Sequence, residues 1–397
     1  MRRLLPLLAP ALLITISAPA QTAYDNNALG VKKRFADRER AAISEPFEGV
    51  RTSEGVESGL FAIEPTGEST TAIVEAADAF LKALTPAQLL QTQFAVDDTE
   101  WRRWFNVDNG IYTRQGTSLR EMNADQKAAA RHLMATTLSA RGLALADAIR
   151  QTDQTLKEIN HGAIHLDEEL YFFTIMGVPS ATDPWGWQID GHHLVINAFI
   201  LGDQIVMTPT FLGAEPARTT TGKYAGNTVL QAEQNDALAF MQSLSADQQE
   251  AATLSREKRR NSIQAEAASD NAVVDYAGVS VATFTDAQKK QLLALAENYI
   301  GNLRDGHAAI WMDQIEAHID DTWFAWIGAT DDDAVFYYRI HSPVILIEFD
   351  HQGPVGTRSL HRGRQPVRDH IHTIIRTPNG NDYGKDLLRQ HLETHHR

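Results

Sequence analysis

The segment Phe336-Tyr-Tyr-Arg-Ile-His341-Ser-Pro-Val-Ile-Leu-Ile-Glu-Phe-Asp350 decides the fold class. Two runs of β-branched and aromatic residues, separated by Ser-Pro, predict two strands at 335–341 and 344–350. The same signals predict strands at 322–327 and 370–377 and an upstream block at 170–176, 193–201 and 204–209. Because helix signals lie around both blocks, we expect an α+β protein with antiparallel sheet flanked by helices.

Helix starts follow one sequence pattern, in which a capping residue is followed three positions later by Gln. The four examples are Thr85-Pro-Ala-Gln88, Asn123-Ala-Asp-Gln126, Ser245-Ala-Asp-Gln248 and Thr285-Asp-Ala-Gln288. Each predicts a capping box, which satisfies the free N–H groups of a first helical turn. We read the pattern as helix capping rather than as a functional repeat. The expected helices are 73–84, 124–138, 140–160, 228–244, 246–260, 286–303 and a short one at 386–396, with a frayed helix or exposed crossing at 254–272.

The N-terminus resembles a secretory signal. Arg2-Arg3, the apolar stretch Leu4–Ile16 and Ala18-Pro-Ala20 predict a signal peptide over residues 1–20 and export to the periplasm or beyond. We expect a polar, irregular segment over 21–67, containing a strand near 57–63, and a single α+β domain over 68–397. No other apolar run approaches the length of a membrane span.

Composition limits the chemistry. The chain has no cysteine, so a bound metal must be held by His, Asp or Glu. Removing Arg2 and Arg3 takes the formal net charge from −15 to −17. This acidity argues against nucleic acid as a partner, because nucleic-acid binding depends on basic contacts to phosphate. A small-molecule ligand or substrate is the expected partner.

The stretch Trp185-Gly-Trp-Gln-Ile-Asp-Gly-His-His193 is a candidate site. In one interpretation a histidine of the pair is a metal ligand or an acid–base, while Trp185, Trp187 and Asp190 line a pocket. In the other, both tryptophans are core residues and His192 or His193 is hydrogen-bonded to the backbone. On a regular strand adjacent side chains point to opposite faces, so one ion can bind both His192 and His193 only where the backbone is irregular.

Glu348 stands in a run that otherwise reads as buried on both faces. A buried carboxylate needs a partner, because desolvation of its charge is costly. Glu348 is therefore a candidate metal ligand or proton acceptor, and a salt bridge to Arg339 or Arg376 is equally compatible with the pattern.

His370 and His372 are two residues apart on a predicted strand and should share one face with Arg376. This spacing can present two imidazoles to one ion, with a third ligand from elsewhere. The same face could also bind an anion without a metal. Imidazole and carboxylate suit zinc, iron and copper, and the sequence does not choose among them.

The sequence lacks the common hydrolase, metalloprotease, phosphate-loop and dinucleotide motifs. It resembles a family of bacterial exported proteins classed as a domain of unknown function, number 3500. The resemblance rests on Trp185-Gly-Trp187, Asp190-Gly-His-His193, Thr208-Pro-Thr-Phe-Leu-Gly213, Glu215-Pro216, Phe324-Ala-Trp326, Tyr337-Tyr-Arg-Ile340, Ile347-Glu348, His370-Ile-His372 and Asn381-Asp-Tyr-Gly-Lys-Asp-Leu-Leu-Arg389. It implies a shared fold and a shared site, and it supplies no activity.

Three functions are compatible with these residues. The leading hypothesis is a metal-dependent hydrolytic or oxidative enzyme. Its expected ligands or acid–base groups are His192, His193, Glu348, His370 and His372, with Glu348 and His193 as the catalytic candidates and Trp185, Trp187, Asp190 and Arg376 as ligand-binding residues. The alternatives are a metal-free binding protein for a small molecule and an envelope interaction module without catalysis.

Overall fold

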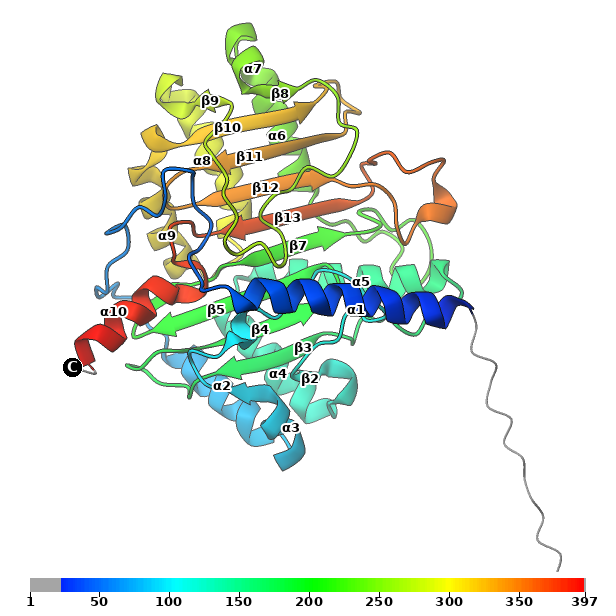
Figure 1. The fold of residues 1–397 in the computed structure, drawn as a ribbon, viewed down its shortest axis with the longest axis vertical. Helices are drawn as coiled ribbons and strands as arrows, with labels where there is room; N and C mark the ends of the chain where they lie inside the picture. The colour runs from blue at the N-terminus through cyan, green and yellow to red at the C-terminus, as the bar shows by residue number, and fades with distance from the viewer. Residues whose placement is uncertain (1–22, 396–397) are drawn as a thin grey trace, which may run out of the picture.

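The structure is a computed structural model that describes residues 23–395. One continuous sheet of 13 strands runs through it, in the order β1-β3-β4-β5-β7-β13-β12-β11-β10-β8, with β2, β6 and β9 paired at its margins. Pairing is antiparallel except for β1 with β3 and β8 with β10. Figure 1 shows this sheet with helices behind it and α1 crossing its front face. The predicted α+β class is confirmed.

The elements of the chain up to the middle of the sheet form one series. They are α1 (Ala23–Ser44), α2 (Thr71–Ala83), α3 (Pro86–Thr92), β1 (Gln93–Phe94), β2 (Thr117–Ser118), α4 (Ala124–Thr137), α5 (Ala140–Ile159), β3 (Phe172–Met176), β4 (Trp185–Gly191), β5 (Leu194–Leu201), β6 (Gln204–Val206) and β7 (Thr210–Ala214).

The remaining elements form a second series. They are α6 (Gln231–Ser243), α7 (Ala246–Ala252), β8 (Thr253–Ser255), β9 (Val279–Ser280), α8 (Asp286–Ile300), α9 (Asp305–Ala317), β10 (Trp323–Gly328), β11 (Phe336–His341), β12 (Leu346–His351), β13 (Ile371–Arg376) and α10 (Lys385–His395).

From α2 onward the two series repeat one another. Two helices, a short strand, a second short strand, two more helices and four long strands follow in the same order, apart from the small extra strand β6. The register repeats as well: the pairs Phe172↔Asp190 and Trp187↔Ala198 correspond to Trp323↔His341 and Tyr338↔Phe349. The two halves therefore share one architecture.

The halves meet along the antiparallel pair β7·β13, so an approximate twofold axis passes through the middle of the sheet. Hydrogen bonds on the helical side follow the same symmetry: Ser139 N donates to Asn302 O and Arg304 N donates to Thr137 O, both at 3.0 Å. All four predicted capping boxes are present. Their repetition reflects this duplication.

Two cores cover the two faces of the sheet. On the back face, residues such as Ile371 and Ile375 of β13 pack with α2, α4, α6 and α8. On the front face, Ile374 packs with Leu387 and Leu388 of α10 and with the segment between β8 and β9. Side chains on successive residues of a strand point to opposite faces, so this alternation assigns His370, His372 and Arg376 to the front face.

Several predicted elements need correction. The segment 21–67 contains the long helix α1, which is mostly polar and reaches the core through Phe35, whose ring packs on Phe105 at 5.1 Å. Residues 57–63 form no strand. The helix expected over 246–260 ends at Ala252, because the following residues extend and pair with β10 as β8. The unexpected strand β4 begins at Trp185. The single-domain boundary at residue 68 stays a prediction.

The predicted signal peptide lies in residues 1–20, outside the described part of the chain. Among residues 23–395, no helix combines the length and the apolar character needed to cross a membrane.

Candidate metal centre

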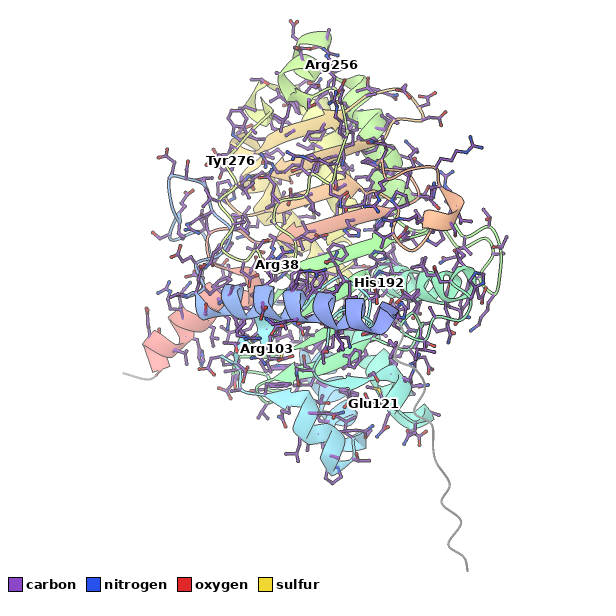
Figure 2. The ribbon with its side chains drawn as sticks, turned by 45° about the vertical axis from the view of Figure 1, so that its right-hand side comes forward. Arg38, Arg103, Glu121, His192, Arg256 and Tyr276 are labelled. Atoms are coloured by element: carbon purple, nitrogen blue, oxygen red, sulfur yellow. The ribbon has the colours of Figure 1, made fainter. Side chains whose placement is uncertain are left out.

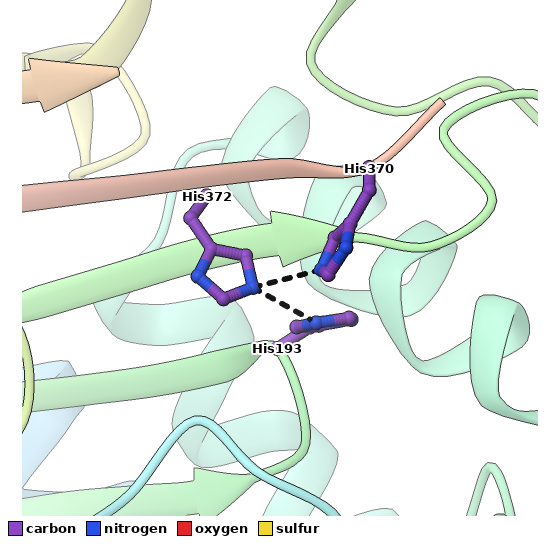
Figure 3. Close-up of side chains that lie close together, drawn as sticks. All are labelled: His193, His370 and His372. Atoms are coloured by element: carbon purple, nitrogen blue, oxygen red, sulfur yellow. Dashed lines mark hydrogen bonds between the residues drawn. The ribbon is translucent and has the colours of Figure 1, made fainter. Parts of the chain in front are cut away.

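Three imidazoles from two separate parts of the sheet meet at one point. His370 precedes β13, His372 lies within it, and His193 comes from the turn between β4 and β5. The Nε2 atom of His372 lies 3.0 Å from Nε2 of His370 and 3.2 Å from Nε2 of His193. Figure 3 shows the three rings converging in this way. They are the one group among the described residues whose His, Cys, Asp or Glu side chains could jointly hold an ion.

A tight turn aims His193 at the other two rings. Gly191 pairs with Leu194, so His192 and His193 are the two residues of a hairpin loop. His193 has a φ of +61°, in the left-handed region, which costs a residue with a Cβ atom about 1 kcal/mol. Its carbonyl accepts a hydrogen bond from Gly213 N at 2.8 Å. The backbone is thus irregular at this histidine pair, but only His193 joins the group of three.

A backbone carbonyl and a carboxylate contact His370 on its Nδ1 side, away from the other two histidines. Its Nδ1 atom lies 2.8 Å from Gly353 O, and Glu215 Oε2 lies 3.7 Å from the same nitrogen. A carbonyl oxygen can only accept, so Nδ1 of His370 carries the proton. Glu215 itself accepts hydrogen bonds from Thr357 and from the backbone N–H groups of Val355 and Gly356.

A carboxylate also holds His372. Nδ1 of His372 lies 2.6 Å from Glu266 Oε1, and Asn106 Nδ2 donates to the same carboxylate oxygen at 3.0 Å. The Nδ1 proton of His372 is therefore donated to Glu266. A carboxylate behind a ligating imidazole fixes the ring orientation and its tautomer.

The proton positions decide what the three rings can bind. Because His370 and His372 donate through Nδ1, their neutral rings present bare Nε2 lone pairs to each other at 3.0 Å. Two facing lone pairs repel unless a positive charge lies between them. The third ring, His193, has no hydrogen-bond partner at its buried Nδ1. A cation held by the three Nε2 atoms resolves the repulsion.

Burial disfavours the charged form of His193 and of His370. His193, His370 and His372 are 2%, 3% and 8% exposed. Burial and the neighbouring histidines hold the pKa of His193 well below its usual range. Burial lowers the pKa of His370 to about 4, although Glu215 opposes the change. Neutral imidazole is the form that ligates metals.

His192 lies beside the cluster. Its ring stacks on His193, with centroids 3.9 Å apart, and its Nδ1 atom lies 2.5 Å from Asp153 Oδ1. Tyr171 donates to the other oxygen of Asp153 at 2.8 Å. Burial opposes the charged form of His192, but Asp153 raises its pKa. His192 is labelled in Figure 2 and lies in the turn between β4 and β5.

A family model matches residues 66–385, which include both structural halves and all three clustered histidines. The chain belongs to this family, described as Protein of unknown function (DUF3500). No curated protein and no solved structure matches the chain. Helix α1 lies outside the matched residues, so the features common to the DUF3500 family are expected within the sheet and its helices.

Glu348 of this DUF3500 chain, predicted as a ligand, lies outside the group of three histidines. Its carboxylate accepts hydrogen bonds from Tyr337 and from the backbone N–H groups of Gln264 and Ala265. Burial raises its pKa. Hydrogen bonds, rather than an ion, satisfy this carboxylate. His192, also predicted as a ligand, is outside the group as well and pairs with Asp153.

The predicted ligand-binding residues have structural partners. Arg376 is fully buried between Asp270 and Asp382, at 2.7 and 3.1 Å. Asp190 forms an ion pair with Arg114 at 3.0 Å, and burial raises its pKa to about 7. Both side chains thus have charged partners within the protein, and their role in binding a ligand stays a prediction.

The two tryptophans belong to the back-face core, as the second interpretation of that stretch proposed. Trp185 donates to Ser180 O, and Trp187 donates to the hydroxyl of Thr137. Both are fully buried. They support the sheet from the face opposite the histidines.

Sequence reasoning missed the residues that surround the cluster. Asp153 lies in helix α5, whereas Asn106, Glu215 and Glu266 lie outside the regular elements. Glu215 was visible only as part of the family motif Glu215-Pro216. Nothing in the sequence around Asn106 or Glu266 distinguishes them from other polar residues, because their role depends on where long connections cross the sheet.

Proposed function

We propose that this chain is a metal-dependent enzyme whose single metal ion is held by Nε2 of His193, His370 and His372. The observation that carries the proposal is the set of three converging Nε2 atoms. The rings of His370 and His372 carry their protons on Nδ1, where Gly353 O and Glu266 accept them. Three protein ligands with one open position are typical of catalytic zinc, and imidazole also suits copper and iron.

Hydrolytic chemistry fits the ligand set best. Three neutral imidazoles leave the charge of a divalent ion uncompensated, which favours a metal that lowers the pKa of bound water or polarises a carbonyl or phosphoryl oxygen. An iron oxygenase site more often contains two histidines and one carboxylate, and no carboxylate joins this group. Oxidative chemistry with copper is the alternative on the same ligands.

Cobalt substitution tests both the ligands and the open position. Untagged protein loaded with Co²⁺ should show the strong visible absorption of a low-coordinate nitrogen site, and added azide should shift those bands by binding at the open position. His370→Ala should remove the bands, whereas His132→Ala, on the exposed surface of α4, should leave them unchanged. Absorption bands that do not shift when azide is added would indicate a structural site with no open coordination position.

Metal-free binding of a small molecule is a second candidate function, supported by a groove that is separate from the three histidines. A groove of about 450 Å³ lies beyond the other end of β13, where Thr377, Val206 and Trp311 contribute to its walls. A metal-independent rise in Tm with a small-molecule library, lost on Val206→Trp but retained in His372→Ala, would favour this function.

A further inference from the structure

The two halves of the chain differ most on the side where the histidines lie. In the first half α5 has 20 residues, against 13 for its counterpart α9. In the second half β12 and β13 are joined by residues 352–370, whereas β5 and β7 are joined by the short stretch 202–209. Both additions therefore depart from a shared scaffold.

The two additions pack against each other at the candidate metal centre. Near the end of α5, Asn160 Nδ2 donates to Gly356 O at 2.9 Å. The same long connection supplies Gly353 O to His370, and three of its backbone N–H groups hold Glu215. The additions thus build the walls of the cluster.

The symmetry-related position lacks ligating side chains. The pairs Gly191↔Leu194 and Ile196↔Thr210 place Pro343 and Val344 in the turn that corresponds to His192 and His193. The residue that corresponds to His372 is Met207. Only one of two equivalent places on the scaffold carries the histidines, and it is the place with the added segments.

The long connection 352–370 is strongly basic in an acidic chain. Arg358, Arg362 and Arg364 are exposed, and none of the three takes part in an ion pair among the described residues, although the whole chain has a formal net charge of −15. By contrast, the exposed Arg256 and Arg259 contact Glu250 and Glu257. The connection stands out from the body of the molecule in Figure 1, between β12 and β13.

The basic connection is tied directly to the metal centre. A Cβ atom on Gly353 would lie 2.6 Å from Arg364 O, so the backbones of these residues are in contact. Gly353 is the residue whose carbonyl holds His370. This contact joins the backbone of the arginine-bearing connection to the residue that holds His370.

We propose that the substrate of the metal centre is an anion with more than one phosphate, sulfate or carboxylate group, held at its outer end by Arg358, Arg362 and Arg364. The inference rests on the proposed metal function. Guanidinium groups bind oxyanions through paired N–H donors. The inner surroundings of the histidines are acidic, with Asp153, Glu215 and Glu266 close by, so an anionic substrate needs this outer positive field to approach.

Titration calorimetry on the full, untagged chain tests the proposal, with and without one equivalent of Zn²⁺. The probes are fructose 1,6-bisphosphate, a heparin-derived hexasaccharide and neutral maltohexaose, which separate a small anion from a polymer segment. At least one anionic probe should bind, more tightly with Zn²⁺ than without, and maltohexaose should not. The triple variant Arg358→Gln, Arg362→Gln, Arg364→Gln should lose at least tenfold in affinity.

A matched triple variant controls for net charge. Arg131→Gln, Arg256→Gln, Arg389→Gln removes three exposed arginines that each contact a carboxylate, and it should keep affinity within twofold of the wild type. Equal losses in both triple variants, or no binding of either anionic probe, would overturn the proposal. Anion binding that Zn²⁺ does not strengthen, in protein that does bind Zn²⁺, would separate the basic connection from the metal centre and also refute it. Failure to bind Zn²⁺ at all would refute the metal function itself, a distinct result.

Discussion

Glu266→Gln should weaken metal binding without abolishing it. Glu266 Oε1 lies 2.6 Å from Nδ1 of His372, and the carboxylate is only partly exposed, so its charge acts on the ring at short range. The amide oxygen of Gln can still accept the Nδ1 proton, but it lacks the negative charge that makes the imidazole a stronger ligand. Loss of such a partner typically lowers metal affinity by about 10- to 100-fold, or roughly 1.4 to 2.7 kcal/mol.

Competition with a calibrated zinc chelator measures this change. Glu257→Gln is the matched control, because Glu257 lies in the same connection and is exposed at the surface. We expect one Zn²⁺ per chain in all three proteins, with reduced affinity only in Glu266→Gln. Unchanged affinity in that variant would refute the idea that Glu266 supports a ligating histidine, as would an equal loss in Glu257→Gln.

Three further perturbations follow from the same geometry. Gly213→Ala would place a Cβ atom 3.2 Å from the His193 ring and 2.9 Å from Ile371 O. Zinc affinity should therefore fall, and thermal unfolding should show that the free energy of unfolding drops by about 1–3 kcal/mol. Wild-type zinc affinity in this variant would contradict the packing around Gly213. His341 is buried with its pKa lowered to about 3, so the unfolded chain takes up a proton below about pH 6.5 while the folded chain does not. The wild type therefore loses stability as the pH falls. In urea unfolding, its free energy of unfolding should drop by about 2 kcal/mol more than that of His341→Gln between pH 7 and pH 5. Parallel pH profiles of the two proteins would show that buried His341 does not make this contribution. Glu215→Gln should loosen residues 353–357, because it weakens the hydrogen bonds from their backbone N–H groups. Amide hydrogen exchange in these residues should be faster than in the control variant Glu64→Gln. Identical exchange in the two variants would show that Glu215 does not hold the loop.

The sequence was sufficient for the parts of the fold that depend on local patterns. The strands around Tyr337 and Ile347 were predicted because β-branched and aromatic runs between turn residues are local signals. The capping boxes at Thr85 and Thr285 were recognised for the same reason. Their pairing into two related halves was not, because it depends on strand register between distant segments. Helix α1 was missed because most of its surface is polar and Phe35 is a weak signal on its own.

Only the part of the candidate site that depends on a local strand pattern was predicted. The spacing of His370 and His372 places both rings on one face of a strand, and the structure brings His193 to them. Glu348 also lies on a buried strand, but its partners are the backbone N–H groups of a crossing connection, which no strand pattern predicts. A left-handed residue in a two-residue turn, as at His193, was likewise not expected from a sequence that lacks Gly or Asn there.

The metal content of untagged wild-type protein tests the central claim most directly. After exposure to Zn²⁺, Cu²⁺ and Fe²⁺ in separate samples and removal of free ions, elemental analysis should find close to one ion per chain for at least one metal. His372→Ala should reduce that value to near zero, and the exposed control His132→Ala should not change it. Wild-type protein that retains none of the three metals would contradict the account.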